Sequence, residues 1–421
     1  MEKNSELVPI EDFYSLKIKS IWNHVKDEGF SFWMICCYLF FEYVRPQSII
    51  PALDFLPWAQ LFIIFSGVGW LFEKNRRWVG VPANKWMVIF FIVIILSSLF
   101  GMSPATSYSR LADFYLWLII YFLIINIVTT EKRLFVFLLI FIVASFKLSL
   151  FGAKTWAFRG FGFTKWGIMG PPGFFQNSGE LAIQMLIFFG LSWYFYIAIR
   201  KYLTGVRLFL VRLFSVTAAM TVLGASSRGG QLGLVVQILM TGRVKVRFLA
   251  GIICVGMLGF WLMPQEQIER FQSIGEDKTS IQRMMYWENG WEMMKDNPVL
   301  GVGYYNFQPY YERYYPNDLL YKRAQLPHNI FIQVGADLGF TGLIVYLILI
   351  GQVFITGRRV RAICDKDSFI YLISKGVEVG FVGFIVAGLF VSVTYYPFMW
   401  IQLAIMSSIS NIAKGAASDQ G

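Results

Sequence analysis

Charged residues are scarce in this sequence. They make up 15% of the 421 residues, whereas hydrophobic residues make up 56% and aromatic residues 18%. Because soluble globular domains carry about 25% charged residues, the composition excludes an ordinary soluble enzyme and indicates a polytopic membrane protein. The sequence also has no P-loop and no Gly-x-Ser-x-Gly turn, so it offers no sign of ATP-driven chemistry or of an α/β-hydrolase site.

Cysteine and histidine are rare as well, with four and two residues. Cys36, Cys37 and Cys254 lie within apolar runs and Cys364 lies in a charged segment, so no disulfide framework is indicated. Neither residue type is clustered with the spacing of metal ligands. We therefore expect chemistry that needs no metal and no other cofactor.

Long apolar runs fill most of the chain. A helix needs about 20 residues to cross a hydrocarbon layer of roughly 30 Å, and about twelve runs approach that length. These runs are 31–45, 57–72, 86–102, 111–128, 134–151, 180–199, 207–224, 229–242, 247–263, 330–355, 377–394 and 397–413. The first lacks a small-residue cleavage site, so we expect a retained span and not a signal peptide. The sequence predicts an all-α polytopic membrane protein with about twelve transmembrane helices.

Basic residues alternate with these runs. They gather before the first run and after each even-numbered run up to the tenth, at Lys17, Lys19, Lys26, Lys74, Arg76, Arg77, Lys85, Lys132, Arg133, Arg200, Lys201, Arg207, Arg243, Lys245, Arg247, Arg358, Arg359, Arg361 and Lys366. Because short cytoplasmic loops collect Lys and Arg, we expect both termini in the cytoplasm. The net charge of +11 then reflects orientation in the membrane, not a nucleic-acid partner.

This topology divides the chain into three parts. Residues 1–264 hold a cytoplasmic segment and transmembrane helices one to nine, and residues 329–421 hold helices ten to twelve and the cytoplasmic C-terminus. Residues 265–328 form one long external loop with short amphipathic helices. External arginines run against the charge bias, so Arg159, Arg228 and Arg283 each need an explanation other than orientation.

Arg228 precedes an unusually short span. The run 229–242 has 14 residues, about 21 Å at the helical rise, which predicts that Arg228 is recessed below the outer surface. The small residues Ser227, Gly229 and Gly230 leave room for an anionic head group near a helix N-terminus. The alternative is that Arg228 only reaches lipid phosphates.

Arg283 lies in a predicted amphipathic helix. Thr279 and Gln282 fit a capping box, and a stop at Asn297-Pro298 ends the helix. Its apolar residues fall at helical spacing and predict one apolar face on the membrane surface, formed by Met284, Trp287, Trp291 and Met294. The alternative for Arg283 is a solvated residue in the first turn of this helix.

His328 is the only histidine on the external side, because His24 lies in the N-terminal segment. At the mouth of the tenth span, beside Asn329, it can serve as a general base near neutral pH, although a structural role is also open. Seven tyrosines between Tyr304 and Tyr321 fit either an aromatic belt at the membrane interface or a surface that stacks on sugars.

The order of these motifs resembles the O-antigen ligase and polymerase superfamily. Ser227-Arg228-Gly229 precedes a short span, Arg283 is followed by Trp287, and Asn-Pro-Val-Leu-Gly-Val-Gly occupies 297–303. His328-Asn329 then opens a run that contains Gly-Phe-Thr-Gly-Leu at 339–343. The resemblance covers roughly residues 170–350.

The resemblance implies a GT-C-like glycosyltransferase of the bacterial inner membrane. Such enzymes take a glycan from an undecaprenyl diphosphate carrier at the periplasmic face, and true ligases pass it to lipid A-core. By position Arg228, Arg283 and His328 are the expected catalytic residues. Arg159, Asn177 and Asn329 are expected to bind substrate. Membrane lipids are the remaining expected partners.

Three other functions compete with this one. A polymerase that joins repeat units and a ligase that transfers glycan to protein share the superfamily. A polysaccharide flippase is a different class, but it would place charged residues near the bilayer midplane and often show internal repeats. In this sequence the charges gather near the external face and no repeat is visible, which favours transfer chemistry.

Overall fold

The computed structural model describes residues 8–74, 76–164, 166–242 and 278–418, and all regular structure in them is helical. The all-α expectation is thus confirmed for these residues. The elements are α1 (Ile10–Tyr14), α2 (Ile18–Val25), α3 (Phe30–Tyr43), α4 (Pro46–Ile49), η1 (Pro51–Leu53), α5 (Trp58–Phe72), α6 (Ala83–Phe100), α7 (Pro104–Arg110), α8 (Ala112–Ile127), α9 (Glu131–Phe158), α10 (Ser178–Ile199), η2 (Arg200–Tyr202), α11 (Gly205–Gly224), α12 (Arg228–Thr241), α15 (Lys278–Asp296), α16 (Phe307–Tyr314), η3 (Pro316–Asp318), α17 (Ile330–Ile363), α18 (Phe369–Gly388) and α19 (Pro397–Ser418).

Most of the predicted spans are helices. Each apolar run falls on a helix except 247–263, which lies outside the described residues. Seven helical segments of the described chain are long and apolar enough to cross a membrane, namely Ala83–Phe100, Pro104–Ile127, Glu131–Phe158, Ser178–Tyr202, Gly205–Gly224, Ile330–Ile363 and Phe369–Gly388. The chain is therefore a polytopic membrane protein, and the number twelve stays a prediction.

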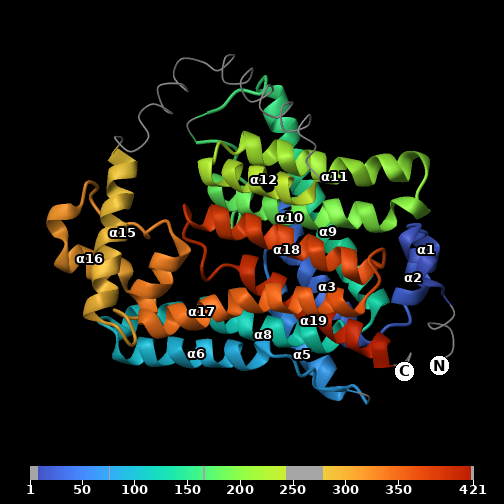
Figure 1. Ribbon diagram of the computed structural model, residues 1–421, viewed down its shortest axis with the longest axis horizontal. Coiled ribbons are helices and arrows are strands. Elements are labelled where there is room, and N and C mark those ends of the chain that lie inside the picture. The colour runs from blue at the N-terminus through green and yellow to red at the C-terminus, as the bar shows by residue number, and fades with distance from the viewer. Residues whose placement is uncertain (1–7, 75, 165, 243–277, 419–421) are drawn as a thin grey trace.

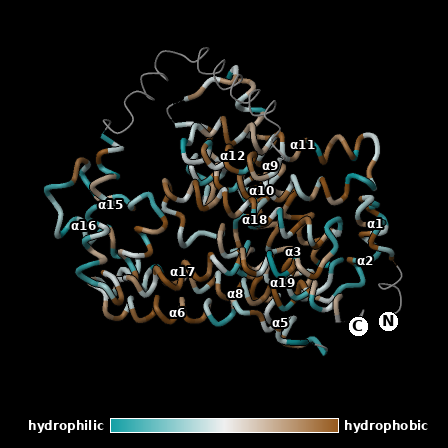
Figure 2. Tube along the Cα trace, viewed as in Figure 1, coloured by the Kyte–Doolittle hydropathy of each residue, from teal (hydrophilic) through white to brown (hydrophobic). Residues whose placement is uncertain are grey.

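The long helices pack side by side in one bundle (Figure 1). At one end of the bundle, α15 lies across the direction of the other helices, and α16 lies beside it. At the other end lie α1 and α2 (Figure 1). Hydrophobic residues run along the bundle helices, whereas hydrophilic residues gather around α15 and α16 (Figure 2). We refer to these two ends as the α15 end and the α1–α2 end.

The basic loops meet at the α1–α2 end. Tyr14 of α1 donates a hydrogen bond to Glu131 at the start of α9, and its ring stacks on Phe369 at the start of α18 with centroids 5.3 Å apart. Arg207 near the start of α11 donates to the Ser15 carbonyl oxygen at 2.9 Å. The described basic loops between α8 and α9, between α10 and α11, and between α17 and α18 thus meet on one side of the bundle, as the charge pattern predicts. The basic residues at 243–247 lie outside the described residues.

The helix α17 is broken at Gly339. Gly339 has φ 69° and ψ −172°, so α17 consists of two helical pieces. The motif at 297–303 fills the break. Val302 N–H donates to the Ala336 carbonyl oxygen at 2.9 Å, Gly303 N–H donates to the Asp337 carbonyl oxygen at 3.1 Å, and Phe340 N–H donates to the Pro298 carbonyl oxygen at 2.8 Å. Backbone groups released by the break are thereby satisfied.

The predicted eleventh span is wrong at its end. The run 377–394 suggested a helix to residue 394, but α18 begins at Phe369 and ends at Gly388, and 389–396 form a loop. The first residues of the loop are apolar and pack against neighbouring helices. Phe390 lies against Gly229 and Val391 against Gly179. We refer to residues 389–396 as the α18–α19 loop.

We predict that Gly339→Ala destabilises the protein by about 1 to 3 kcal/mol, because a side chain raises the cost of a left-handed conformation. A Cβ at Gly339 would also lie 2.7 Å from the Pro298 carbonyl oxygen. The control is Gly351→Ala in the same helix, where a Cβ would meet nothing within 4 Å. Thermal unfolding in detergent should show a lower midpoint for Gly339→Ala alone. Equal midpoints for the two variants would contradict this account of the break.

Candidate functional site

The amphipathic helix exists as α15, but it differs from the sequence expectation. Its described part begins at Lys278, so Thr279 lies inside the helix and is not its N-cap. Met284 and Trp291 of the predicted apolar face are 50% and 47% exposed, whereas Met294 is buried. The face turned inward instead contains Gln282, Tyr286, Asn289, Gly290, Met293 and Met294. The exposed Met284 and Trp291 fit the apolar face expected at the membrane surface. The inward face was not expected because two of its positions, Gln282 and Asn289, are polar.

Those two polar residues hold the loop beyond α16. The Gln282 side-chain amide donates to the Asp318 carbonyl oxygen at 2.9 Å and accepts from Leu320 N–H at 2.5 Å, so it does not serve the predicted capping box. Asn289 donates to Tyr311 Oη at 2.9 Å and to an Asp318 carboxylate oxygen at 2.8 Å. A fully bonded amide can be buried without the desolvation cost of an unbonded one.

The buried tyrosines of this region form a core. Tyr286 and Tyr311 meet edge to face with ring centroids 4.8 Å apart, and Phe307 lies 5.8 Å from both. All three are fully buried, as is Tyr304. For these residues the structure gives neither of the two expected roles, because a buried ring reaches neither lipid nor sugar. Tyr314 differs, with 52% of its surface exposed.

His328 is held in an unusual backbone conformation. It has φ 53°, which is uncommon for a residue other than glycine. Its N–H donates to Ser392 Oγ of the α18–α19 loop at 2.7 Å. The carbonyl oxygen of the preceding Pro327 accepts from Trp287 Nε1 of α15 at 2.8 Å. Two elements distant in sequence therefore fix the backbone on both sides of this imidazole.

Asn329 caps α17. Its side-chain oxygen accepts hydrogen bonds from Phe331 N–H at 2.9 Å and from Ile332 N–H at 3.2 Å. The Asn329 side chain was expected to bind substrate, but its oxygen is used to cap the helix. It fixes the helix start directly after His328, as an N-cap asparagine does.

The positive charge of Arg283 acts on the imidazole of His328. Burial lowers the pKa of His328, and the nearby Arg283 guanidinium lowers it further, to about 4. Both effects disfavour the imidazolium ion, since a charge is costly in a buried place and repels a second charge of the same sign. The structure thus brings together two of the three expected catalytic residues, which are far apart in the chain. A base near neutral pH was expected from the sequence, whereas the surroundings of His328 hold its pKa below the ordinary value.

Arg228 opens the short helix α12. Ser227 is its N-cap, with Oγ accepting from Gly230 N–H at 3.3 Å, and the Arg228 side chain is exposed. The neighbouring glycines do not leave room for a ligand. A Cβ at Gly229 would lie 2.8 Å from Phe390, and one at Gly230 would lie 2.7 Å from Ala182 Cβ. Their small size serves helix packing, which corrects the sequence expectation.

The α18–α19 loop connects Arg228 with His328. Phe390 contacts Gly229, next to Arg228, and Ser392 binds the backbone of His328. Hydropathy does not separate this loop from a span, because most of its residues continue an apolar run. One signal was present, since Ser392 and Thr394 interrupt that run before Pro397, and proline favours the first turn of a helix.

Arg159 and Asn177 lie near the same region. Arg159 ends α9, and its Nη1 lies 3.5 Å from the Gly167 carbonyl oxygen. The next residue, Ile168, donates its N–H to the Gly224 carbonyl oxygen at 3.2 Å, close to Ser227 and Arg228 in the chain. Asn177 caps α10, accepting from Gly179 N–H at 2.8 Å. Both side chains are exposed, and each has a structural contact of its own.

Two further arginines were not singled out from the sequence. The Arg45 guanidinium lies against the backbone of Gly173, where a Cβ would overlap it. Arg110 lies 3.5 Å from the Asp113 carboxylate and over the Tyr305 ring at 5.6 Å. Arg45 ends the first apolar run and Arg110 directly precedes the fourth, so the predicted topology would place both on the external side.

The arrangement offers guanidinium groups and a neutral imidazole. In the described residues no group of three or more His, Cys, Asp or Glu side chains could hold a metal ion. Guanidinium groups bind phosphate oxygens through paired hydrogen bonds, and a neutral imidazole can accept a proton or donate a hydrogen bond.

A comparison with protein families identifies one region of the chain. Residues 213–347 match the family model described as O-antigen ligase. This region belongs to the O-antigen ligase superfamily. The ligase region includes Arg228, Arg283 and His328, whereas Arg159 and Asn177 lie outside it. None of the curated proteins compared with the chain matches it.

We predict that His328 stays neutral down to about pH 4. Replacing Arg283 by Met should raise the pKa of His328, because one positive neighbour is removed while burial remains. Nitrogen NMR of histidine-labelled protein in detergent can follow both imidazoles, and a His328→Gln sample assigns the signals. A wild-type value near 6.5, unchanged by Arg283→Met, would contradict the pairing.

Proposed function

We propose that this protein is a ligase-like glycosyltransferase. It transfers a glycan from an undecaprenyl diphosphate carrier to a hydroxyl group, with lipid A-core as the acceptor, at the periplasmic face of the bacterial inner membrane. The observation that carries the proposal is the contact between α15 and the start of α17 within the ligase region. Trp287, one helical turn after Arg283, donates to the carbonyl oxygen of Pro327, the residue before His328. Membership in the superfamily supports a lipid-linked glycan as donor.

Arg228 and Arg283 bind the diphosphate in this proposal. As the bond between the anomeric carbon and the phosphate oxygen breaks, its electron pair stays on the leaving diphosphate. Two guanidinium groups aimed at those oxygens stabilise the charge that develops. They can do so without a metal ion, so the reaction is proposed to be metal-independent.

His328 is the proposed base. The acceptor oxygen forms the new bond to the anomeric carbon while its proton passes to the imidazole, and attack opposite the leaving group inverts that carbon. The imidazole must be neutral to accept the proton, and burial together with Arg283 favours the neutral form. Ser392 and Trp287 position it through the backbone on either side.

We predict that Arg228→Lys and Arg283→Lys each lose transfer by about 100-fold or more, since losing one aligned donor to a developing oxyanion costs roughly 3 kcal/mol. An ammonium cannot replace the paired hydrogen bonds of a guanidinium. Arg313→Lys is the control, because Arg313 is exposed on α16. Near-normal transfer by Arg228→Lys or Arg283→Lys would remove that residue from the diphosphate site.

The same assay tests the base and the acceptor. Purified protein is mixed with an undecaprenyl diphosphate glycan and one of three acceptors, which are lipid A-core, a second carrier-linked glycan and an acceptor protein. The products of each mixture are sized on a gel. His328→Ala should lose transfer, and His328→Gln should lose it as well unless the imidazole only donates a hydrogen bond to phosphate. Product with the second carrier-linked glycan alone would identify a polymerase, and product with protein alone would identify a protein ligase.

The orientation is tested by thiol labelling in a cysteine-free background. Lys295→Cys lies on α15 and Asp367→Cys lies between α17 and α18, and both positions are exposed. A membrane-impermeant reagent applied to intact spheroplasts should label position 295, and position 367 should react only after permeabilisation. The reverse pattern would place the arginine and histidine site in the cytoplasm and contradict a periplasmic reaction.

A further inference from the structure

The short helices α1 and α2 lie where several candidate spans begin. Tyr14 contacts Glu131 of α9 and Phe369 of α18, and Ser15 accepts a hydrogen bond from Arg207 of α11. Glu131 and Phe369 are the first residues of segments apolar enough to cross a membrane. The ends of such spans mark the level of the membrane surface, so α1 and α2 lie at that level.

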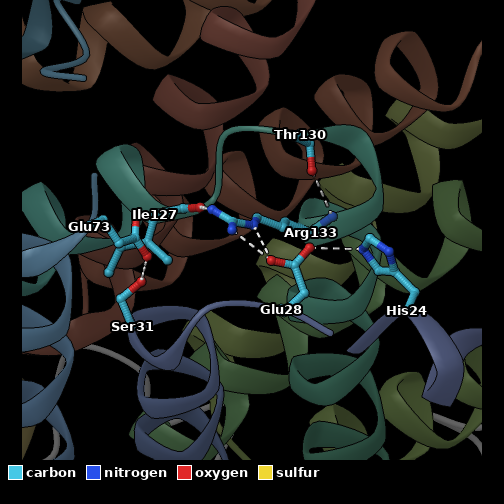
Figure 3. A network of polar contacts seen from close by, with 7 residues as sticks. All are labelled: His24, Glu28, Ser31, Glu73, Ile127, Thr130 and Arg133. Carbon is cyan, nitrogen blue, oxygen red and sulfur yellow. Dashed lines mark hydrogen bonds and ion pairs between the residues drawn. The ribbon is translucent and has the colours of Figure 1, made fainter. Parts of the chain in front are cut away.

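A buried polar network fixes one side of α2 (Figure 3). His24 Nε2 lies 3.0 Å from a Glu28 carboxylate oxygen, and the other oxygen accepts from Arg133 Nη2 at 2.6 Å and Nε at 2.7 Å. Burial raises the pKa of Glu28, but hydrogen bonds from His24 and Arg133 outweigh it and lower the pKa to about 2. The charged pair with Arg133 on α9 therefore persists at physiological pH and sets which face of α2 points outward.

The outward side of α2 is apolar and flanked by lysines. Ile18 and Trp22, one helical turn apart, are 82% and 57% exposed. Lys19 and Lys26 are also exposed. Because they are seven residues apart, they lie on the same side of the helix, next to the side that carries Ile18 and Trp22. Of the nearby acidic residues, Asp12 is paired with Lys17 at 2.7 Å, and Asp27 is exposed just after the helix.

This apolar surface continues onto the bundle. The Trp22 ring meets Trp33 of α3 edge to face with centroids 5.8 Å apart, and Phe30 at the start of α3 is 56% exposed. Tryptophan favours the boundary between water and lipid, and a helix with an apolar face and lysines beside it lies in that boundary. Lysines there attract acidic lipid head groups.

We propose that α2 is an interfacial anchor that binds a bilayer surface containing acidic phospholipid. Ile18 and Trp22 enter the boundary between head groups and acyl chains, while Lys19 and Lys26 contact lipid phosphates. The surface lies at the end of the bundle opposite α15 (Figure 1). The anchor depends on the chain being a membrane protein and is independent of the proposed transfer chemistry.

The first experiment measures how deeply Ile18 and Trp22 lie in the bilayer, using the full-length protein in nanodiscs. Single cysteines at Ile18→Cys and Trp22→Cys, in a cysteine-free background, carry an environment-sensitive fluorophore. Asp367→Cys is the control, since Asp367 is exposed in a loop that leads into α18 at the same end. Lipids brominated near the top of the acyl chain should quench positions 18 and 22, whereas aqueous iodide should quench position 367. Quenching of 18 and 22 by iodide and not by lipid would overturn the proposal.

Lipid selectivity is measured next with the label at position 18. Brominated phosphatidylglycerol should quench it more strongly than brominated phosphatidylcholine at the same total composition. The double variant Lys19→Gln and Lys26→Gln should lose this difference, whereas Lys366→Gln, which removes another exposed charge at the same end, should keep it. Equal quenching by the two lipids in the unmodified lysine background would refute the acidic-lipid site, and a protein partner would instead shield the label from both quenchers.

Discussion

The break of α17 at Gly339 is the constraint on which the α15 end depends. A helix interrupted inside an apolar bundle leaves carbonyl and N–H groups without partners, and such groups are costly in a dry environment. Here the motif at 297–303 supplies those partners. The segment between α15 and α16 is thereby fastened to a bundle helix through its backbone, so its position does not rest on side-chain contacts alone.

This fastening positions the proposed catalytic groups. The first piece of α17 carries His328 and Asn329 at its start and Ala336 and Asp337 at its end. The Asp337 side chain accepts from Phe307 N–H at 3.1 Å and from Tyr395 Oη at 3.2 Å. One short helical piece therefore contacts α16 and the α18–α19 loop at one end and presents the imidazole at the other. Such rigid support is what a preorganised site requires.

The sequence predicted helices well and their contacts less well. The spacing of apolar residues located α15 and the short α12, and charge alternation located the basic end. The end of α18 was missed because Phe390 and Val391 are covered by protein, and hydropathy cannot separate that covering from lipid. The inward face of α15 was missed because Gln282 and Asn289 are buried through hydrogen bonds to residues beyond α16. Asn329 shows why site residues are harder to predict than helices. An asparagine before an apolar run predicts a helix cap as readily as a ligand contact.

The pairing of Arg283 with His328 also sets an order for the proposed reaction. Without a donor, burial and the guanidinium hold the pKa of His328 at about 4, so the imidazole is a weak base. A diphosphate bound to Arg283 offsets the positive charge and brings negative charge close to the imidazole, which raises the pKa. A general base works best when its pKa is near the ambient pH. In the proposed reaction, carrier binding therefore makes His328 a stronger base.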